Sequence, residues 1–236
     1  MSDIWTILWK EAKDQLFQGG WRSLIRPLIV VGVIGIYLPL QLGLQWVALT
    51  PLSMILLLWI PFFVIISFIG DAIAGERERH TLETLLASRI PDQAILLGKI
   101  IATVLYAWGM GILSLLLGLL LVNLFRTGGN WMFYPLNLFV DAIVLILLAS
   151  VLAASAGVLI SLRVATVRQA QQILSVGTIV LVFGIIFILQ ALPAKFVSSL
   201  TYQQFLLIAI AFFAVLDAIL LGLSLMSFQR SRLILS

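Results

Sequence analysis

Residues 136–161 read LNLFVDAIVLILLASVLAASAGVLIS, an apolar run whose one charged side chain is that of Asp141. A helix needs about 20 mostly apolar residues to cross the roughly 30 Å hydrocarbon core of a membrane. Comparable runs recur along the chain, and in lipid such runs have to satisfy their own backbone as helices. We therefore predict an all-α membrane protein with six spans, over residues 24–45, 51–73, 97–125, 136–161, 173–192 and 204–228.

The composition of the whole chain agrees with this class. Of its 236 residues, 62% are hydrophobic and 10% are charged, which excludes an ordinary soluble domain. Six spans with short loops occupy nearly all of residues 1–236, so we expect a single transmembrane domain ending in a tail at 229–236. Cysteine is absent, which excludes disulfides and thiolate chemistry.

Basic residues predict how the chain is oriented. Loops on the cytoplasmic side of a membrane carry an excess of Lys and Arg. With both termini cytoplasmic, the outer loops hold only Arg126 and Lys195. The inner side then holds Lys10, Lys13, Arg22, Arg26, Arg77, Arg79, Arg89, Lys99, Arg163, Arg168, Arg230 and Arg232. We predict a multi-pass protein of the inner (plasma) membrane, and the net charge of +4 fits contact with anionic lipid headgroups.

Residues 1–20 precede the first span and are amphipathic. At 100° per residue, Trp5 and Trp9 share an apolar arc, and Lys10 and Lys13 lie on the other side. Such a segment is typical of a helix lying in the membrane interface. Its role is either that of a peripheral anchor or that of a working part next to the cytoplasmic loop.

The loop at residues 75–96 is far more charged than its surroundings. It begins GERERHTLETLLASR and contains the chain's one histidine. Leu82, Leu85 and Leu86 have the spacing of one helix face, and Pro91 with Asp92 favours the start of a second helix that runs into span three. A simple connection between neighbouring helices takes about 2–8 residues. The longer loop indicates a surface for a soluble partner rather than a linker.

The motif ERERHTLETLL at 76–86, followed by Pro91 and ILLGK at 95–99, resembles the cytoplasmic loop of type-2 ABC exporter permeases. The number of spans, the inner termini and the interfacial helix resemble that family as well. Relatives commonly have glycine before the threonine, whereas this chain has His80, which leaves the start of the loop helix open. The resemblance implies a coupling helix that docks on an ATP-binding subunit through Glu76, Glu78, Thr81, Leu82, Glu83, Leu85 and Leu86.

The same resemblance implies the partners and cofactors. No Gly-x-x-x-x-Gly-Lys-Ser/Thr motif occurs, because Gly98-Lys99 is followed by Ile100. We therefore expect ATP and Mg²⁺ to bind a separate ABC ATP-binding subunit and no cofactor to bind this chain. The chain would be a transport subunit rather than an enzyme, paired with a second copy or a sister permease.

Two acids fall inside predicted spans, Asp141 near the outer end of span four and Asp217 near the middle of span six. Ionisable residues are costly in the membrane and mark functional sites by default, although a neutral acid bonded to a neighbouring helix is the structural alternative. They support a second hypothesis, an ion- or proton-coupled secondary carrier. Such carriers show half-sequence symmetry, which this chain lacks.

Other functions find little support. One histidine cannot build a multi-histidine metal site or a membrane-embedded catalytic triad, so we predict neither a metal site nor catalytic residues. A lipid-modifying enzyme ranks last because polar residues do not converge. A nucleic-acid partner is not expected, since no basic groove with stacking aromatics is present.

Two segments of the sequence are each compatible with two structural roles. Span four carries a row of small residues suited to close helix packing, either within the chain or at a dimer seam. The second inner loop, 163–172, is either a lesser docking point or a plain linker. The small residues are Ala149, Ser150, Ala153, Ala154, Ser155 and Gly157.

Overall fold

The computed structural model describes residues 2–13, 20–70, 75, 78, 91–164, 166–191 and 201–227. Every regular element within these ranges is helical. The long helices are α1 (Ser2–Lys13), α2 (Gly20–Val31), α5 (Pro51–Gly70), α8 (Asp92–Phe125), α9 (Leu136–Ser161), α10 (Val167–Ala191) and α12 (Tyr202–Ser227). Between α2 and α5 lie the π-helix η2 (Gly32–Tyr37) and the short helices α3 (Leu38–Leu42) and α4 (Leu44–Val47).

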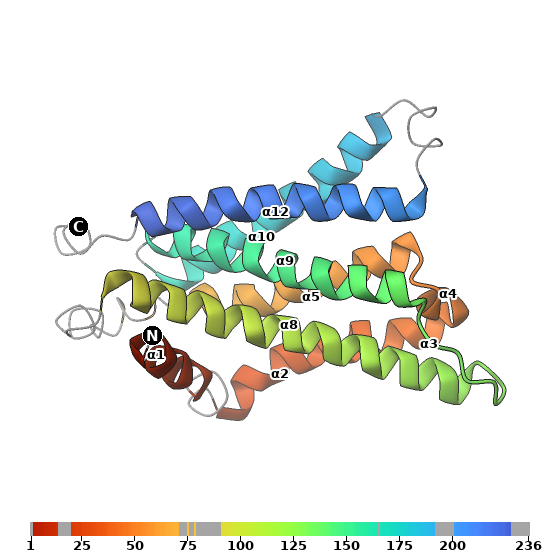
Figure 1. The fold of residues 1–236 in the computed structure, drawn as a ribbon. Helices are drawn as coiled ribbons and strands as arrows, with labels where there is room; N and C mark the ends of the chain where they lie inside the picture. Colours follow the sequence, from red (N-terminus) through yellow and green to blue (C-terminus); the bar gives the residue numbers. More distant parts are fainter. Residues whose placement is uncertain are drawn as a thin grey trace.

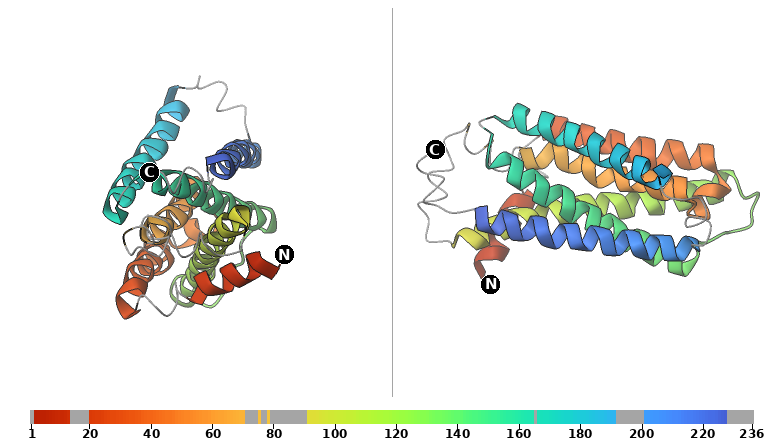
Figure 2. Two further views of the ribbon diagram at one scale, coloured as in Figure 1. Left: turned by 90° about the vertical axis from the view of Figure 1, so that its left-hand side faces the viewer. Right: turned by 90° about the horizontal axis from the view of Figure 1, so that it is seen from above.

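Helices α5, α8, α9, α10 and α12 form an elongated bundle (Figure 1). One end of this bundle holds the first residues of α8 and α10 and the last residues of α5, α9 and α12. We call it the loop end. The N-terminal helix α1 lies there too. Viewed along the bundle, α1 lies crosswise against α8 (Figure 2).

Helix α9 is the centre of the bundle and packs against α5, α8, α10 and α12. Its small residues explain this position. Ala149, Ser150 and Ala154 are fully buried, and small side chains let helix backbones approach closely where lipid gives no hydrophobic drive. The structure therefore uses this row of span four for packing within the chain.

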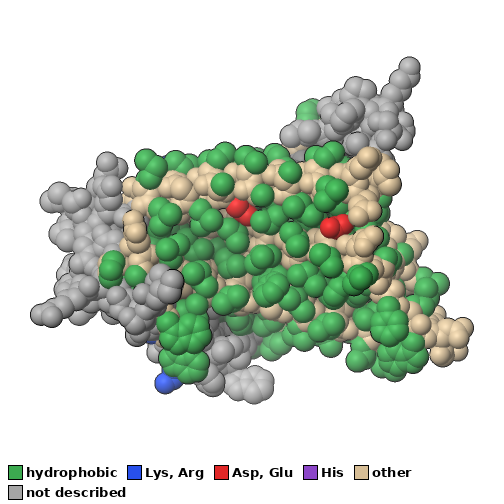
Figure 3. Space-filling view, viewed as in Figure 1, with side chains coloured by type: hydrophobic (Ala, Val, Ile, Leu, Met, Phe, Trp, Pro, Cys, Tyr) green, Lys and Arg blue, Asp and Glu red, His purple; other side chains and the backbone are tan. Residues whose placement is uncertain are grey.

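Three helices in the described part of the chain are long and apolar enough to cross a membrane: Gln93–Phe125, Leu136–Ser161 and Tyr202–Ser227. Shorter apolar helical stretches cover Pro27–Leu42 and Pro51–Ile66. Hydrophobic side chains dominate the face shown in Figure 3, as expected for a surface in contact with lipid. The chain is thus an all-helical, multi-pass membrane protein, and the count of six spans stays a prediction.

Helix α8 is longer than a membrane requires. Its 34 residues rise about 51 Å at 1.5 Å per residue, against a hydrocarbon thickness of about 30 Å. It begins at Asp92, directly after Pro91, and continues unbroken through Gly98 and Lys99. One rigid element therefore joins the charged loop to the middle of the membrane.

The first predicted span, 24–45, is not one regular helix. It passes from α2 through η2 to α3, and Gly43 then ends α3 with a φ of +55°. Within η2, Gly35 packs against α8 so closely that a Cβ there would lie 2.9 Å from the Ser114 Cα. A π-turn changes the phase of the helix faces, which brings this glycine to the contact.

Hydrogen bonds brace the end of the bundle opposite the loop end. The Asn123 Nδ2 donates to the Met132 carbonyl at 2.9 Å, and the Met132 N–H donates back to Asn123 Oδ1 at 2.7 Å. The Arg126 guanidinium donates to the Leu40 carbonyl. The Tyr202 hydroxyl donates to the Leu49 carbonyl at 2.6 Å. These bonds tie α8 to the span-one segment and α12 to the turn before α5.

We expect Gly118→Ala to destabilise the bundle, because a Cβ at Gly118 would collide with the fully buried ring of Trp46. Overpacking of this kind typically costs about 1–3 kcal/mol, so the midpoint of thermal unfolding in detergent should fall. Gly109→Ala is the matched control on the same helix, since a Cβ there meets nothing within 4 Å. Equal midpoints for the two variants would contradict the packing of Trp46 on α8.

Candidate functional site

The sequence places the candidate site at the loop end. Of the seven predicted ATPase-coupling residues, the structure describes Glu78. The other six lie outside the described residues: Glu76, Thr81, Leu82, Glu83, Leu85 and Leu86. The geometry of the site is therefore built from Glu78 and from the helices that begin at this end.

Glu78 contacts the second inner loop. Its carboxylate accepts a hydrogen bond of 3.0 Å from the Val167 N–H, the first residue of α10. The Thr166 Oγ1 accepts a further bond from the Gln169 N–H at 3.2 Å, as a helix cap does. A carboxylate also suits the positive end of the helix dipole. The charged loop is thus tied to the start of α10.

A buried ion pair joins α1 to α8. The Lys99 Nζ donates to Glu11 Oε1 at 2.8 Å, and the two side chains are 3% and 11% exposed. Lys99 lies in the third turn of α8, and the Thr103 hydroxyl donates to its carbonyl. Removing one partner of such a pair leaves an uncompensated buried charge, which is strongly destabilising. The pair therefore fixes α1 against the first turns of α8.

The two faces of α1 differ in their surroundings. Ile7 and Glu11, four residues apart, are buried against the rest of the chain, whereas Trp5 and Trp9 are 66% and 67% exposed. The exposed tryptophans form one stripe on the opposite side. Tryptophan favours the headgroup region of a membrane, so a lipid-facing role for this stripe stays a prediction.

Sequence reasoning missed Glu11 and the role of Lys99. Both residues were visible in the sequence, Lys99 as the cation at the start of a long apolar run and Glu11 as the acid inside the amphipathic segment. A lysine that continues into a buried helix needs a counter-charge. That requirement was the available signal, but it did not say which of several acids would supply the charge.

The intramembrane acids Asp217 and Asp141 are not brought into one site. Helices α9 and α12 start at the same end of the bundle and run side by side (Figure 1). Asp141 lies in the second turn of α9, and Asp217 lies about ten residues further along α12, which is about 15 Å in depth. Asp217 is 5% exposed, and neither of its oxygens accepts a hydrogen bond from the described residues. The separation weakens the carrier hypothesis, which used both acids together.

Metal ligands do not cluster in the part of the chain that the structure describes. No group of three or more His, Cys, Asp or Glu side chains lies close enough there to hold an ion.

A family model described as "ABC-2 family transporter protein" matches residues 39–235, which includes α5, α8, α9, α10 and α12. No curated protein matches the chain. The match leaves Glu11 outside and includes Lys99 and the charged loop. The match confirms the resemblance to ABC permeases, and the chain belongs to the ABC-2 family of transporter proteins, as a membrane component of an ABC transporter.

Proposed function

We propose that this chain is the permease subunit of an ATP-driven exporter and that residues 76–86 dock on a separate ABC ATP-binding subunit. Two permeases, identical or paired with a sister chain, would face each other across the path, with two ATPase subunits on the cytoplasmic side. ATP and Mg²⁺ would bind the ATPase, and this chain would supply the path and the coupling contacts. Membership of the ABC-2 family supports the partner class.

The observation that carries the proposal is the buried pair between Glu11 and Lys99. Helix α8 starts at the end of the charged loop and is long enough to reach across the membrane. Because the ion pair fixes α1 to its first turns, a force on the loop would move α1 and α8 as one body. Rigid-body motion of packed elements is an established way to transmit such a change.

The contact between Glu78 and Val167 supplies a second route. The same loop holds the start of α10 through this hydrogen bond, so a displacement of the loop would also reach the fifth predicted span. The second inner loop would then pass on the motion of the charged loop rather than serve as a plain linker. Both routes begin between residues 76 and 91, where the partner would bind.

The proposal places both termini in the cytoplasm of a cell with this protein in its inner membrane. An impermeant thiol reagent should then label Asn130→Cys, in the loop between α8 and α9, from outside. Glu78→Cys should react only after the membrane is opened, because Glu78 lies at the loop end, against the start of α10, and Asn130 lies at the opposite end of the bundle. Labelling of Glu78→Cys in intact cells would reverse the orientation and remove the docking proposal.

We expect Leu85→Ala combined with Leu86→Ala to release the ATPase or to uncouple its hydrolysis from transport. Buried apolar anchors at interfaces typically cost about 2 kcal/mol or more when truncated, while charges at the rim matter less. Glu83→Ala should therefore have a partial effect. The measurement is co-purification of the ATPase with the tagged permease, followed by ATP hydrolysis in lipid.

The matched control for the double variant is Arg168→Ala, an exposed change in the second inner loop. It should affect co-purification less than the two leucines do. Full retention of binding and hydrolysis in the double-leucine variant would remove residues 81–86 from the interface.

Breaking the ion pair should separate coupling from docking. Glu11→Gln removes the carboxylate of the buried pair with Lys99, and breaking a buried pair typically costs about 3–5 kcal/mol. We expect lower thermal stability and poor ATP-driven transport with the ATPase still bound. The charge swap Glu11→Lys with Lys99→Glu should recover part of both, whereas the exposed Lys13→Gln on α1 should change neither. Transport equal to wild type in Glu11→Gln would show that α1 and α8 need not move together.

A further inference from the structure

The connection between α8 and α9, residues 126–135, exposes large apolar side chains, and we call it the aromatic segment. It lies at the end of the bundle opposite the loop end (Figure 1). Trp131 and Phe133 are 63% and 74% exposed, and Leu136, the first residue of α9, is exposed beside them. Exposed apolar side chains that stand together mark a surface for an apolar partner.

The backbone of the aromatic segment is held in place by α8. The side chain of Asn123, buried in the last turn of α8, exchanges two hydrogen bonds with the Met132 backbone, at 2.9 and 2.7 Å. Met132 lies between Trp131 and Phe133 in the sequence. The two exposed rings are therefore carried by a backbone that is fixed between them.

The neighbouring aromatic side chain is treated differently. Tyr134 is buried, its hydroxyl donates to the Leu115 carbonyl at 2.8 Å, and its ring stacks on that of Phe139. The same segment can thus bury an aromatic ring against the bundle. Trp131 and Phe133 stay outside although their neighbour is packed.

The aromatic segment lies at the boundary of the membrane. Helix α9, which follows it, has 26 residues and rises about 39 Å, against a hydrocarbon thickness of about 30 Å. Centred on the hydrocarbon core, such a helix extends about 5 Å beyond it at each end. The residues just before α9 therefore reach the depth of the lipid headgroups.

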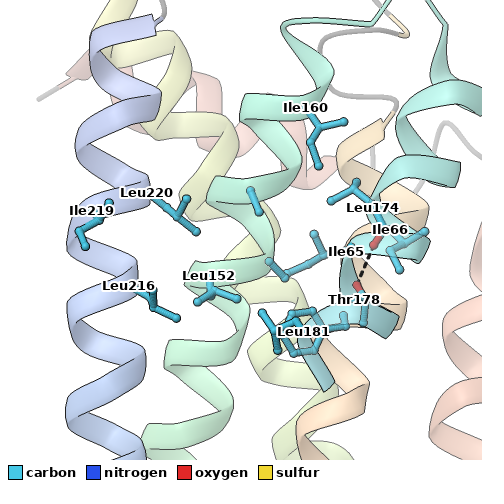
Figure 4. A pocket seen from close by; sticks show the side chains of 14 residues that line it. Ile65, Ile66, Leu152, Ile160, Leu174, Thr178, Leu181, Leu216, Ile219 and Leu220 are labelled. Atoms are coloured by element: carbon cyan, nitrogen blue, oxygen red, sulfur yellow. Dashed lines mark hydrogen bonds between the residues drawn. The ribbon is translucent and has the colours of Figure 1, made fainter. Parts of the chain in front are cut away.

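Exposed tryptophan is confined to the two ends of the described bundle. Trp5 and Trp9 lie on α1 at the loop end, and Trp131 lies at the opposite end. Between these ends, the wall of the cavity of about 270 Å³ between α5, α9, α10 and α12 is mainly aliphatic, with Phe62 as its one aromatic residue (Figure 4). This distribution fits the two interfacial tryptophan belts of a membrane protein.

The charge of the aromatic segment also suits a lipid surface. Residues 126–135 contain one charged side chain, that of Arg126, and no acid. The exposed Arg126 guanidinium donates to the Leu40 carbonyl through Nε and one Nη. A guanidinium carries five N–H donors, so further donors remain for a lipid phosphate, whose geometry it matches.

We propose that the aromatic segment is inserted into the lipid headgroup layer at this end of the bundle. Trp131 and Phe133 reach toward the acyl chains, Arg126 meets the phosphates, and the turn at 128–130 stays in water. Asn123 presets this arrangement. The exposed Leu124 and Val140 continue the apolar surface down α8 and α9, and a soluble partner would have to displace lipid from them. The inference is independent of the ATPase and of the direction of transport.

Because the chain has no cysteine, single-cysteine variants labelled with bimane report each position separately. Phe133→Cys is the test position, the exposed Val140→Cys on α9 is the lipid control, and Asn130→Cys is the water control. The full chain is placed in phosphatidylcholine vesicles with one of two quenchers. These are iodide on both sides of the membrane, so that orientation does not matter, and phosphatidylcholine with a nitroxide near the top of its acyl chain.

We expect the bimane at Phe133→Cys to lose most of its emission to the nitroxide lipid and little to iodide, as at Val140→Cys. Asn130→Cys should show the reverse. Iodide quenching at Phe133→Cys as strong as at Asn130→Cys would overturn the insertion. Protection from both quenchers would place a second copy or another protein over the segment and would overturn it too. Trp131→Cys gives the same readout with Phe133 retained.

The bracing by Asn123 is tested with Asn123→Ala in the Phe133→Cys protein. Loss of both hydrogen bonds to Met132 should free the segment, so iodide should quench the bimane more strongly. Asn137→Ala is the matched control, an exposed residue in the first turn of α9, and should change neither quenching. Equal iodide quenching in the two variants would overturn the claim that Asn123 presets the arrangement.

Discussion

A peptide backbone in hydrocarbon has no water to satisfy its N–H and C=O groups, and this constraint governs the whole structure. It turns each long apolar run into a helix. It also removes the usual reason for helices to associate, because lipid tails are as apolar as leucine. What remains is close packing, which explains why α9, with Ala149, Ser150 and Ala154 buried along it, lies at the centre and meets four other long helices.

Most polar side chains that link elements gather at the two ends, and the Trp108 Nε1, which donates to the Ile143 carbonyl at 3.1 Å, joins α8 to α9 between them. Glu11 and Lys99 join α1 to α8 at the loop end, and Asn123 and Arg126 hold the opposite end. Between them the bundle otherwise relies on shape, as where Gly118 leaves room for the Trp46 ring. The links at the loop end reach two long helices, α8 through Lys99 and α10 through Val167.

Local pattern was sufficient for the regular elements. Span four was predicted at 136–161 and α9 has those bounds, because Pro135 precedes the apolar run and Arg163 follows it. The break in span one was missed, since the π-turn depends on Gly35 meeting Ser114 on another helix. Glu11 was missed for the same reason: its partner is 88 residues away. The hydrophobic periodicity of a helix predicts which of its faces is apolar, but not which other helix will pack against that face.

Asp217 differs from several hydroxyls of the bundle in how it could be satisfied. Ser150, Ser155 and Thr178 each donate to the carbonyl four residues earlier in their own helix, so a hydroxyl needs no neighbour. An ionised carboxylate has no proton to donate, and the N–H groups around it are already used by the helix. A protonated carboxyl, by contrast, can donate to a carbonyl as these hydroxyls do. Neither Asp217 oxygen has a hydrogen-bond partner among the described residues, so a carboxyl in this position needs either a proton of its own or a donor from a neighbouring helix.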